Sequence, residues 1–153
     1  MKYHYKTPIG YLTVTLDESG LIVKTSFEKD SNKTKELPEG KMMNALHYYF
    51  SKKETISQEL ISKEMISTLF QKAVWQEIAK IPLGKTMTYK DVAEKVGRPK
   101  AYRAVGTACG KNEIALFIPC HRVVASDGSL SSYAWGVDRK KWLLEHEGAF
   151  VSR

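Results

Sequence analysis

The sequence is organised around residues 115–124, which read ALFIPCHRVV. An apolar run leads into Pro119, which fixes its own φ and biases the residue before it towards an extended conformation. Burial of the apolar residues on both sides predicts that Cys120 is held at a fixed place near the edge of a core. Nearby positive charge lowers the pKa of a thiol, and His121 and Arg122 are candidates for supplying that charge or relaying the proton. A cysteine in an apolar run is also often a small buried hydrophobe, so these residues alone leave a structural role open.

The composition is that of a globular protein with an excess of positive charge. The chain has 153 residues, of which 42% are hydrophobic and 27% charged, and its formal net charge is +7. This balance favours polyanionic partners without defining a fold. No apolar run is long enough to cross a membrane, and the first residues do not resemble a signal peptide. We therefore expect a cytoplasmic protein that does not bind membranes.

Metal and disulfide chemistry are not expected. Cys109 and Cys120 are the only cysteines, too few for a disulfide framework, and a reducing cytosol disfavours a bridge between them. The four histidines show no metal-ligand spacing with either cysteine. The sequence therefore predicts no metal site.

Residues 1–63 predict a small α/β domain. Residues 3–7, 11–16 and 21–27 are rich in β-branched and aromatic residues and are separated by turn sequences, which is typical of antiparallel strands. A charged loop is expected over residues 30–40, and helical spacing of apolar residues predicts an amphipathic helix over residues 41–51. Residues 52–63 indicate a linker with one short strand around Ile61.

Residues 64–153 change to a helical pattern. Ser67 or Thr68 can cap a first helix that stops before Pro82. Thr88 with Asp91 resembles a capping box that opens a second helix, for which Gly97 is a natural stop.

A third helix is expected over residues 100–109, with Pro99 in its first turn and Gly110 at its end. Together the last two helices predict a helix-turn-helix over about residues 88–110. Small residues on its second helix leave a thin surface beside Arg103 that suits a close approach to a groove. Such units place their second helix on DNA, although two packed helices can also form a plain structural corner.

In combination, these motifs resemble the O6-alkylguanine-DNA alkyltransferase family (methylated-DNA–protein-cysteine methyltransferases). The likeness covers about residues 69–148, and the N-terminal part matches only in outline. It implies an α+β fold in which a small domain with an antiparallel sheet and a helix precedes a mainly helical, winged-helix-like domain. The matching motifs are Thr88-Tyr89, Arg103-Ala104-Val105-Gly106, Asn112, Pro119-Cys120-His121-Arg122-Val123-Val124, Trp142-Leu143-Leu144 and His146-Glu147-Gly148.

The resemblance implies DNA repair by direct reversal of damage, without a cofactor. Cys120 would attack the alkyl carbon on guanine O6 and keep the group as a thioether, so each molecule would react once. His121 would take the thiol proton through a water, and Glu147 would orient that histidine. O4-alkylthymine in DNA is a further candidate substrate.

The family resemblance also implies a monomer that binds double-stranded DNA through the minor groove and flips the damaged nucleotide out. Arg103 would fill the vacated stack, Tyr89 would donate to guanine N3, and Asn112 would brace the loop before the active site. Backbone carbonyls at Cys120 and Val123 would accept from the exocyclic amine of guanine. The implied substrate- and DNA-binding residues are Ala101, Tyr102, Arg103, Gly106, Arg122, Val123, Tyr133, Ala134 and Trp135.

The chain departs from the family pattern at several positions. Ala134-Trp135 stands where the family commonly has Ser-Gly, so the added bulk predicts slower reaction with large adducts such as benzyl than with methyl. Tyr102 replaces a small residue on the DNA-facing helix, where it would turn aside or stack on the sugar-phosphate edge. Lys111 next to Asn112 is a candidate phosphate contact.

Three other functions are compatible with parts of the pattern. A non-catalytic binder of alkylated DNA would resemble the alkyltransferase-like proteins, but those replace the cysteine that this chain keeps. A redox-sensing helix-turn-helix regulator would use Cys120 as its sensor and would need operator specificity and a dimer helix. A cysteine hydrolase would need Cys120 and His121 to meet directly, which is awkward in an extended segment because neighbours point to opposite faces.

Overall fold

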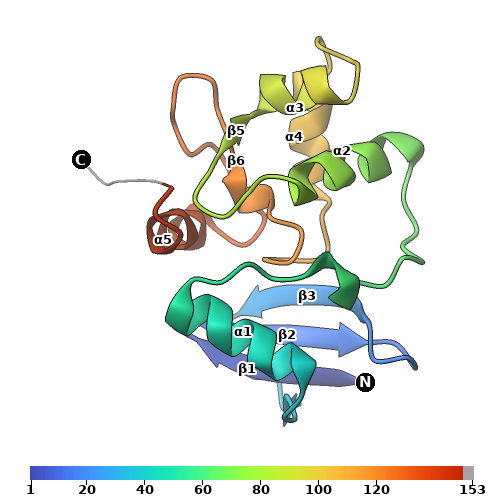
Figure 1. The fold of residues 1–153 in the computed structure, drawn as a ribbon, viewed down its shortest axis with the longest axis vertical. Coiled ribbons are helices and arrows are strands. Elements are labelled where there is room, and N and C mark those ends of the chain that lie inside the picture. Colours follow the sequence, from blue (N-terminus) through green and yellow to red (C-terminus); the bar gives the residue numbers. More distant parts are fainter. Residues whose placement is uncertain (150–153) are drawn as a thin grey trace. The chain divides into compact units, whose positions relative to one another are not determined.

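The computed structural model describes residues 1–149 and divides into two compact units (Figure 1). The first unit comprises Met1–Met65 together with Glu113–Phe117, and the second comprises Ile66–Asn112 and the chain from Ile118 onward. The sequence analysis had placed residues 113–117 in the second domain. They belong to the first unit because the Thr25 N–H donates to Glu113 O at 3.0 Å and the Ala115 N–H donates to Thr25 O at 3.2 Å.

The first unit contains a four-stranded sheet in the order β3-β2-β1-β4. Strands β1 (Lys2–Thr7), β2 (Gly10–Leu16) and β3 (Ile22–Glu28) pair antiparallel, as the sequence predicts. The two-residue strand β4 (Lys35–Glu36) pairs parallel with β1 and lies inside the segment predicted to be a loop. The loop is drawn to the sheet edge because Leu37 is buried and its N–H donates to His4 O at 2.8 Å.

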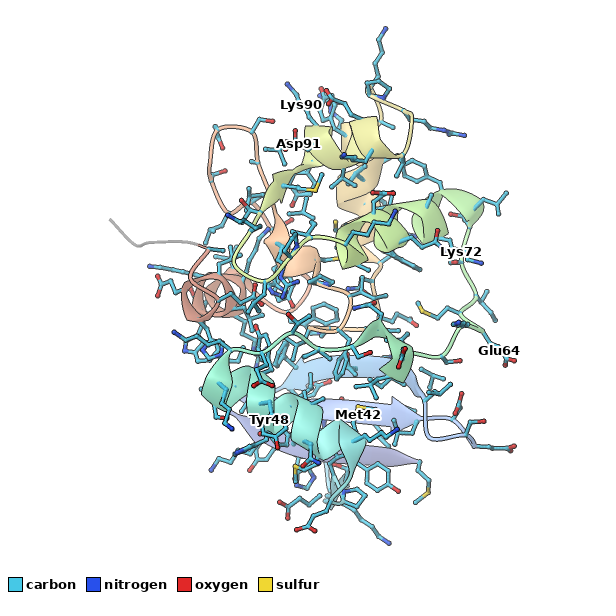
Figure 2. The ribbon with its side chains drawn as sticks, viewed as in Figure 1. Met42, Tyr48, Glu64, Lys72, Lys90 and Asp91 are labelled. Carbon is cyan, nitrogen blue, oxygen red and sulfur yellow. The ribbon has the colours of Figure 1, made fainter. Side chains whose placement is uncertain are left out.

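Helix α1 (Lys41–Lys52) packs in the first unit through one apolar face. Met42, Leu46 and Tyr49 are buried, and Phe50 stacks on Tyr5 of β1 with ring centroids 6.1 Å apart. Tyr48 lies on the exposed side of the same helix (Figure 2). A 3-10 helix, η1 (Gln58–Leu60), follows, and the short strand expected around Ile61 is a single parallel bridge to Ile22.

The second unit begins with two helices whose caps match the sequence analysis. Helix α2 (Leu69–Ala79) starts after Thr68, whose side chain forms a reciprocal capping box with Gln71. Helix α3 (Tyr89–Lys95) starts after Thr88, which forms the predicted capping box with Asp91 (Figure 2). Each box satisfies two backbone N–H groups that the first helical turn leaves without a partner.

Helix α4 (Tyr102–Gly110) completes the helix-turn-helix. It begins two residues later than predicted, since residues 98–101 form a turn closed by an Ala101 N–H bond to Arg98 O. Val105 and Ala108 face inward, and Trp75 Nε1 of α2 donates to Ala108 O at 3.0 Å. Ala108 is therefore part of the core rather than of the thin outer surface expected from the sequence.

The C-terminal half of the second unit carries a short sheet and the last helix. Strand β5 (Met87–Thr88) pairs parallel with β6 (Val123–Val124), which ties the start of α3 to the segment after Cys120. Helix α5 (Val137–His146) buries Leu143 and Leu144. Within residues 1–149, no helix is long and apolar enough to cross a membrane.

Candidate active site

Cys120 lies in a 3-10 turn, η2 (Cys120–Arg122), rather than in an extended strand. The Cys120 N–H donates to Ile118 O at 2.8 Å, and the Arg122 N–H donates to Pro119 O at 2.9 Å. This turn removes the strand alternation that would send neighbouring side chains to opposite faces. Cys120 and His121 therefore both point into the interior, and both are buried.

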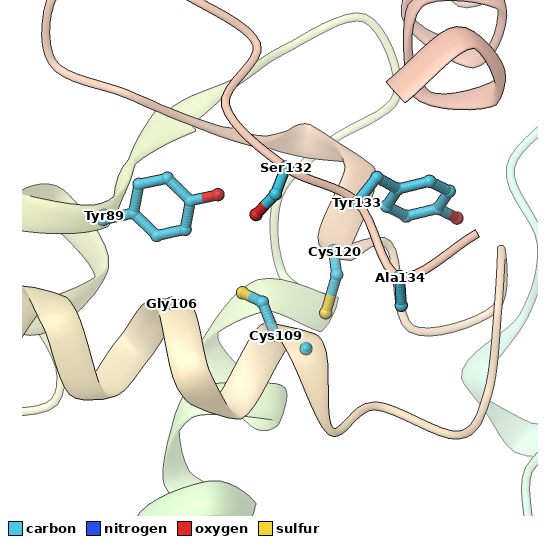
Figure 3. Close-up of a pocket in the computed structure, with 8 residues that line it drawn as sticks. Tyr89, Gly106, Cys109, Cys120, Ser132, Tyr133 and Ala134 are labelled. Atoms are coloured by element: carbon cyan, nitrogen blue, oxygen red, sulfur yellow. The ribbon is translucent and has the colours of Figure 1, made fainter. Parts of the chain in front are cut away.

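A small pocket opens at the Cys120 thiol (Figure 3). Its volume is about 20 Å³, roughly the space that one water molecule needs. Helices α3 and α4, the turn η2 and the segment before α5 each contribute to its wall. The lining residues are Tyr89, Gly106, Cys109, Gly110, Cys120, Ser132, Tyr133 and Ala134.

Asn112 connects the end of α4 to the active-site turn. Its buried side-chain Nδ2 donates to Ile118 O at 3.1 Å and to Cys120 Sγ at 3.3 Å. Asn112 thus contacts both the backbone and the sulfur of the segment that carries Cys120.

Behind Cys120, three buried side chains form a charged network. His121 Nε2 lies 2.8 Å from Glu147 Oε2. Arg122 Nε donates to Glu147 Oε1 at 2.8 Å, and its Nη2 donates to Oε2 at 3.0 Å. This bidentate geometry is the strongest arrangement for a guanidinium and a carboxylate.

The network fixes the protonation of its members. Burial raises the pKa of Glu147, but the hydrogen bonds and charges of His121 and Arg122 outweigh it and lower the pKa to about 2. Burial lowers the pKa of His121, although Glu147 opposes this shift. At neutral pH Glu147 is therefore ionised and His121 is neutral.

The hydrogen bond to Glu147 also selects the tautomer of His121. A carboxylate can only accept, so Nε2 carries the proton and Nδ1 keeps its lone pair. Nδ1 is buried and has no hydrogen-bond partner among residues 1–149. Nδ1 of His121 can therefore accept a proton.

Arg122 was expected to bind DNA, but its side chain is buried inside the protein. It is 7% exposed, and its third nitrogen, Nη1, donates to Ile81 O at 2.8 Å. All three guanidinium nitrogens are thus engaged inside the protein, so the side chain is not available to a phosphate. Its contacts are those of a group that positions Glu147.

Lys140 is a member of the site that the sequence analysis missed. Its side chain is fully buried, and Nζ donates to Val123 O at 2.6 Å and to Ser132 O at 3.2 Å. Burial lowers its pKa to about 8, while the thiols of Cys109 and Cys120 oppose that shift. The sequence does contain a signal for the burial of Lys140, because residues 140, 143, 144 and 147 fall on one helical face and two of them are leucines.

Tyr89 forms the wall of the pocket at the start of α3. The tyrosine is half-buried, and its ring is the nearest neighbour of Gly106, so a Cβ at Gly106 would lie 3.8 Å from Tyr89 Cε1. Burial raises the pKa of the Tyr89 hydroxyl, and the side chain of Ser131 opposes that shift. Tyr89 therefore remains a phenol that can donate a proton at neutral pH.

The other predicted DNA-binding residues fall into an outer and an inner group. Arg103 and Tyr102 are exposed on α4, and Lys90 Nζ lies 5.6 Å from the Tyr102 ring centroid. Ala101 is the N-cap residue of the same helix. The inner group comprises Val123, whose carbonyl oxygen already accepts from Lys140, and Tyr133, whose ring lies 5.2 Å from that of Trp135.

Residues 1–149 contain no group of three or more His, Cys, Asp or Glu side chains that could hold a metal ion. The site instead combines a buried thiol, an oriented imidazole and a nearby ammonium group, beside a helix-turn-helix.

This combination of fold and site defines a cysteine-dependent protein that works on nucleic acid, and comparisons with known proteins agree. The family model described as 6-O-methylguanine DNA methyltransferase, DNA binding domain, matches residues 69–149. A methylated-DNA–protein-cysteine methyltransferase from Methanosarcina mazei is 41% identical and aligns over 96% of this chain and 97% of its own. A methylated-DNA–protein-cysteine methyltransferase from Shigella flexneri is 37% identical and aligns over 93% of this chain and 92% of its own. The chain belongs to the methylated-DNA–protein-cysteine methyltransferase family.

Solved structures extend the likeness to the whole chain. The Mycobacterium tuberculosis OGT, in complex with DNA, has a TM-score of 0.82 and 32% identity and covers 97% of this chain and 92% of its own. Atl1 of S. pombe, in complex with damaged DNA containing O6-carboxymethylguanine, has a TM-score of 0.52 and 33% identity. That match covers 58% of this chain and 84% of the Atl1 chain.

Proposed function

We propose that this protein repairs O6-alkylguanine in DNA by transferring the alkyl group to Cys120. The observation that carries the proposal is the Cys120 thiol at the pocket, backed by a buried His121 that Glu147 orients at 2.8 Å. In the transfer, Cys120 Sγ forms a bond to the alkyl carbon while the bond from that carbon to O6 breaks. The electron pair of the broken bond stays on the guanine, which takes up one proton in place of the one that the thiol gives up, and the thioether on Cys120 ends the activity of that molecule.

His121 is the base in this mechanism. The resting Cys120 is a thiol, because its hydrogen bond with Cys109 and its burial hold its pKa well above the usual value. The lone pair on His121 Nδ1 accepts the thiol proton through a bridging water, and Glu147 stabilises the imidazolium that results. Arg122 is a positioning residue, since it keeps Glu147 ionised and fixed.

Lys140 contributes a positive charge at the same place. Its ammonium group interacts with both pocket thiols and donates hydrogen bonds to the backbone carbonyls of Val123 and Ser132. A cation beside a thiol favours the thiolate. Lys140 therefore supports ionisation of Cys120 without accepting its proton.

DNA reaches the site through the helix-turn-helix. Residues 66–153 carry 14 Lys and Arg against eight Asp and Glu, whereas residues 1–65 carry ten Lys against nine Asp and Glu. The positive excess thus lies in the part of the chain that contains the thiol, as phosphate binding requires. Exposed Arg103 on α4 fills the stack that the flipped nucleotide leaves, with α4 in the minor groove.

The pocket has to open to take the base. A volume of about 20 Å³ holds a water but not a purine. The segment that bears Ser132, Tyr133 and Ala134 is the irregular part of the wall and is the part that moves. Tyr89 then donates to guanine N3 as the purine leaves, and Asn112 holds the turn in place.

Three further features complete the proposal. The protein acts as a monomer in the cytoplasm, it needs no cofactor, and O4-alkylthymine is a second candidate substrate. A non-catalytic binder of alkylated DNA is the other candidate function, because the S. pombe Atl1 structure, in complex with damaged DNA, resembles 58% of this chain. The presence of Cys120 favours transfer.

The test is the mass of the intact protein after mixing with a duplex that carries one O6-methylguanine. We expect a gain of one methyl group that saturates at one per molecule, and no gain in Cys120→Ser. Ser129→Ala, at an exposed position outside the pocket, is the control for the effect of a substitution as such. It should gain the methyl group as the wild type does. Tight binding to the lesion without any mass gain would instead identify the non-catalytic binder.

A further inference from the structure

The two cysteines of the chain meet in the pocket. Cys109 lies in the last turn of α4 and Cys120 in η2, and both line the same cavity (Figure 3). The electrostatic interaction between their two thiols shifts the pKa of each. The alkyl transfer described above uses Cys120 alone, so the role of Cys109 beside it is unexplained.

The two thiols differ in accessibility and in charge. Cys109 is half-buried, whereas Cys120 is only 4% exposed. The hydrogen bond from Cys120 lowers the pKa of Cys109, and the ammonium group of Lys140 acts in the same direction. Cys109 is therefore the sulfur that a small oxidant in solution meets first, and its lowered pKa favours the reactive thiolate.

We propose that Cys109 and Cys120 form a redox-active pair that a peroxide converts into an intramolecular disulfide. Cys109 thiolate attacks one peroxide oxygen, the O–O bond breaks, and Cys109 becomes a sulfenic acid while hydroxide leaves. Cys120 Sγ then attacks the Cys109 sulfur, the S–O bond breaks, and the second hydroxide leaves with the thiol proton as water. A dithiol reductant returns two electrons and two protons and restores both thiols.

The geometry suits this chemistry. A disulfide requires sulfurs about 2.05 Å apart, and two thiols that line one cavity of about 20 Å³ have only a short gap to close. Neither cysteine lies in the interior of a long rigid element, because Cys109 is one residue from the end of α4 and Cys120 starts a three-residue turn. A reversible bridge of this kind is the form in which disulfides occur in reducing compartments.

The consequence for repair rests on the proposed function. While the bridge is present, Cys120 has no thiol with which to accept an alkyl group. The bridge also protects the nucleophile, since it stops oxidation before the irreversible sulfinic acid forms. The pair therefore works as a reversible block on alkyl transfer.

The test is peptide mapping of the reduced full-length protein after treatment with hydrogen peroxide. Free thiols are capped with iodoacetamide, and the protein is digested without a reductant. We expect a peptide pair joined through Cys109 and Cys120, a loss of both capped thiols, and full recovery of both after dithiothreitol. This experiment uses no DNA, so its result tests the disulfide independently of the alkyl transfer.

Cys109→Ser and Cys109→Ala are the matched variants. In both, Cys120 should gain oxygen and lose its capped thiol irreversibly under peroxide that the wild type survives. Circular dichroism checks that each variant is folded. Oxygen gain on Cys120 at the same rate in wild type and variants, or bridges only between molecules, would overturn the proposal.

Discussion

Glu147 is the residue on which the buried network depends, since both His121 and Arg122 bind its carboxylate. Glu147→Gln would leave the Arg122 charge buried without an anion, which costs about 3 kcal/mol of unfolding free energy. It would also release His121, so we expect alkyl transfer to slow by about 100-fold. Urea unfolding and single-turnover transfer measure the two effects.

Glu145→Gln is the matched control on the same helix. Glu145 is exposed, and its contact with Lys141 is 4.0 Å long. The change should therefore alter the unfolding free energy by less than about 0.5 kcal/mol. Equal effects of the two substitutions would contradict the role given to Glu147.

The same residues predict how stability depends on pH. The pKa of Glu147 falls from 4.5 to about 2 on folding, so its contribution of about 3 kcal/mol is present above pH 4.5 and is lost as the pH falls through about 2. The pKa of His121 is lowered as well, so the unfolded chain takes up that proton first and stability declines below about pH 6.5. Urea midpoints that stay constant from pH 7 to pH 3 would refute this assignment.

Lys140 predicts a pH effect on the reaction itself. Its charge favours the thiolate, so Lys140→Met should slow transfer and move the pH–rate profile to higher pH. Because the pKa of Lys140 is about 8, the side chain loses its charge above that pH. The transfer rates of the wild type and Lys140→Met should therefore converge as the pH rises above 8. Lys141→Met, an exposed neighbour, is the control and should keep the wild-type profile.

At the scale of elements, we propose that helix α4 brings DNA to the pocket and that Arg103 fills the vacated stack. Arg103→Ala should reduce transfer from duplex O6-methylguanine by about 100-fold, because the vacated stack stays unfilled. Transfer from the free base O6-methylguanine should be unchanged, since no flipping is needed. Lys72→Ala on the exposed side of α2 (Figure 2) is the charge-matched control, and an equal loss with the free base would contradict the role of α4.

We expect the segment before α5 to limit the size of the alkyl adduct that the pocket accepts. Trp135 contacts the ring of Tyr133, which lines the pocket. The wild type should therefore transfer benzyl more slowly than methyl, and Trp135→Gly should raise the benzyl rate by about tenfold relative to the methyl rate. Single-turnover rates with the two adducts provide the test. A wild-type benzyl rate equal to the methyl rate would rule out this steric effect.

Elements with local signals were predictable from the sequence, and long-range contacts were not. Thr88 and Asp91 are three residues apart, so their capping box could be read directly and is present. The Arg122–Glu147 pair joins residues 25 positions apart, and no local pattern shows that the arginine faces inward. Lys140 does share a helical face with Leu143 and Leu144, but this local signal is easily overlooked because a lysine on a helix is most often solvated.

At the scale of the whole molecule, the sequence predicted two parts with different characters. The structure also forms two compact units, but the chain returns to the first unit at Glu113–Phe117. That excursion separates Asn112 from Cys120 in sequence, and the hydrogen bond from Asn112 Nδ2 to Cys120 Sγ brings them together again. The sequence does not show that residues 113–117 belong to the first unit, because they resemble any buried apolar run.

The central claim is that Cys120, and not the neighbouring Cys109, accepts the alkyl group. The direct measurement is tandem mass spectrometry of the digested protein after reaction with duplex O6-methylguanine that carries a deuterated methyl group. The account predicts the label on Cys120 alone, with Cys109 still free to react with iodoacetamide. A deuterated methyl group on Cys109, or one shared between the two sulfurs, would contradict it.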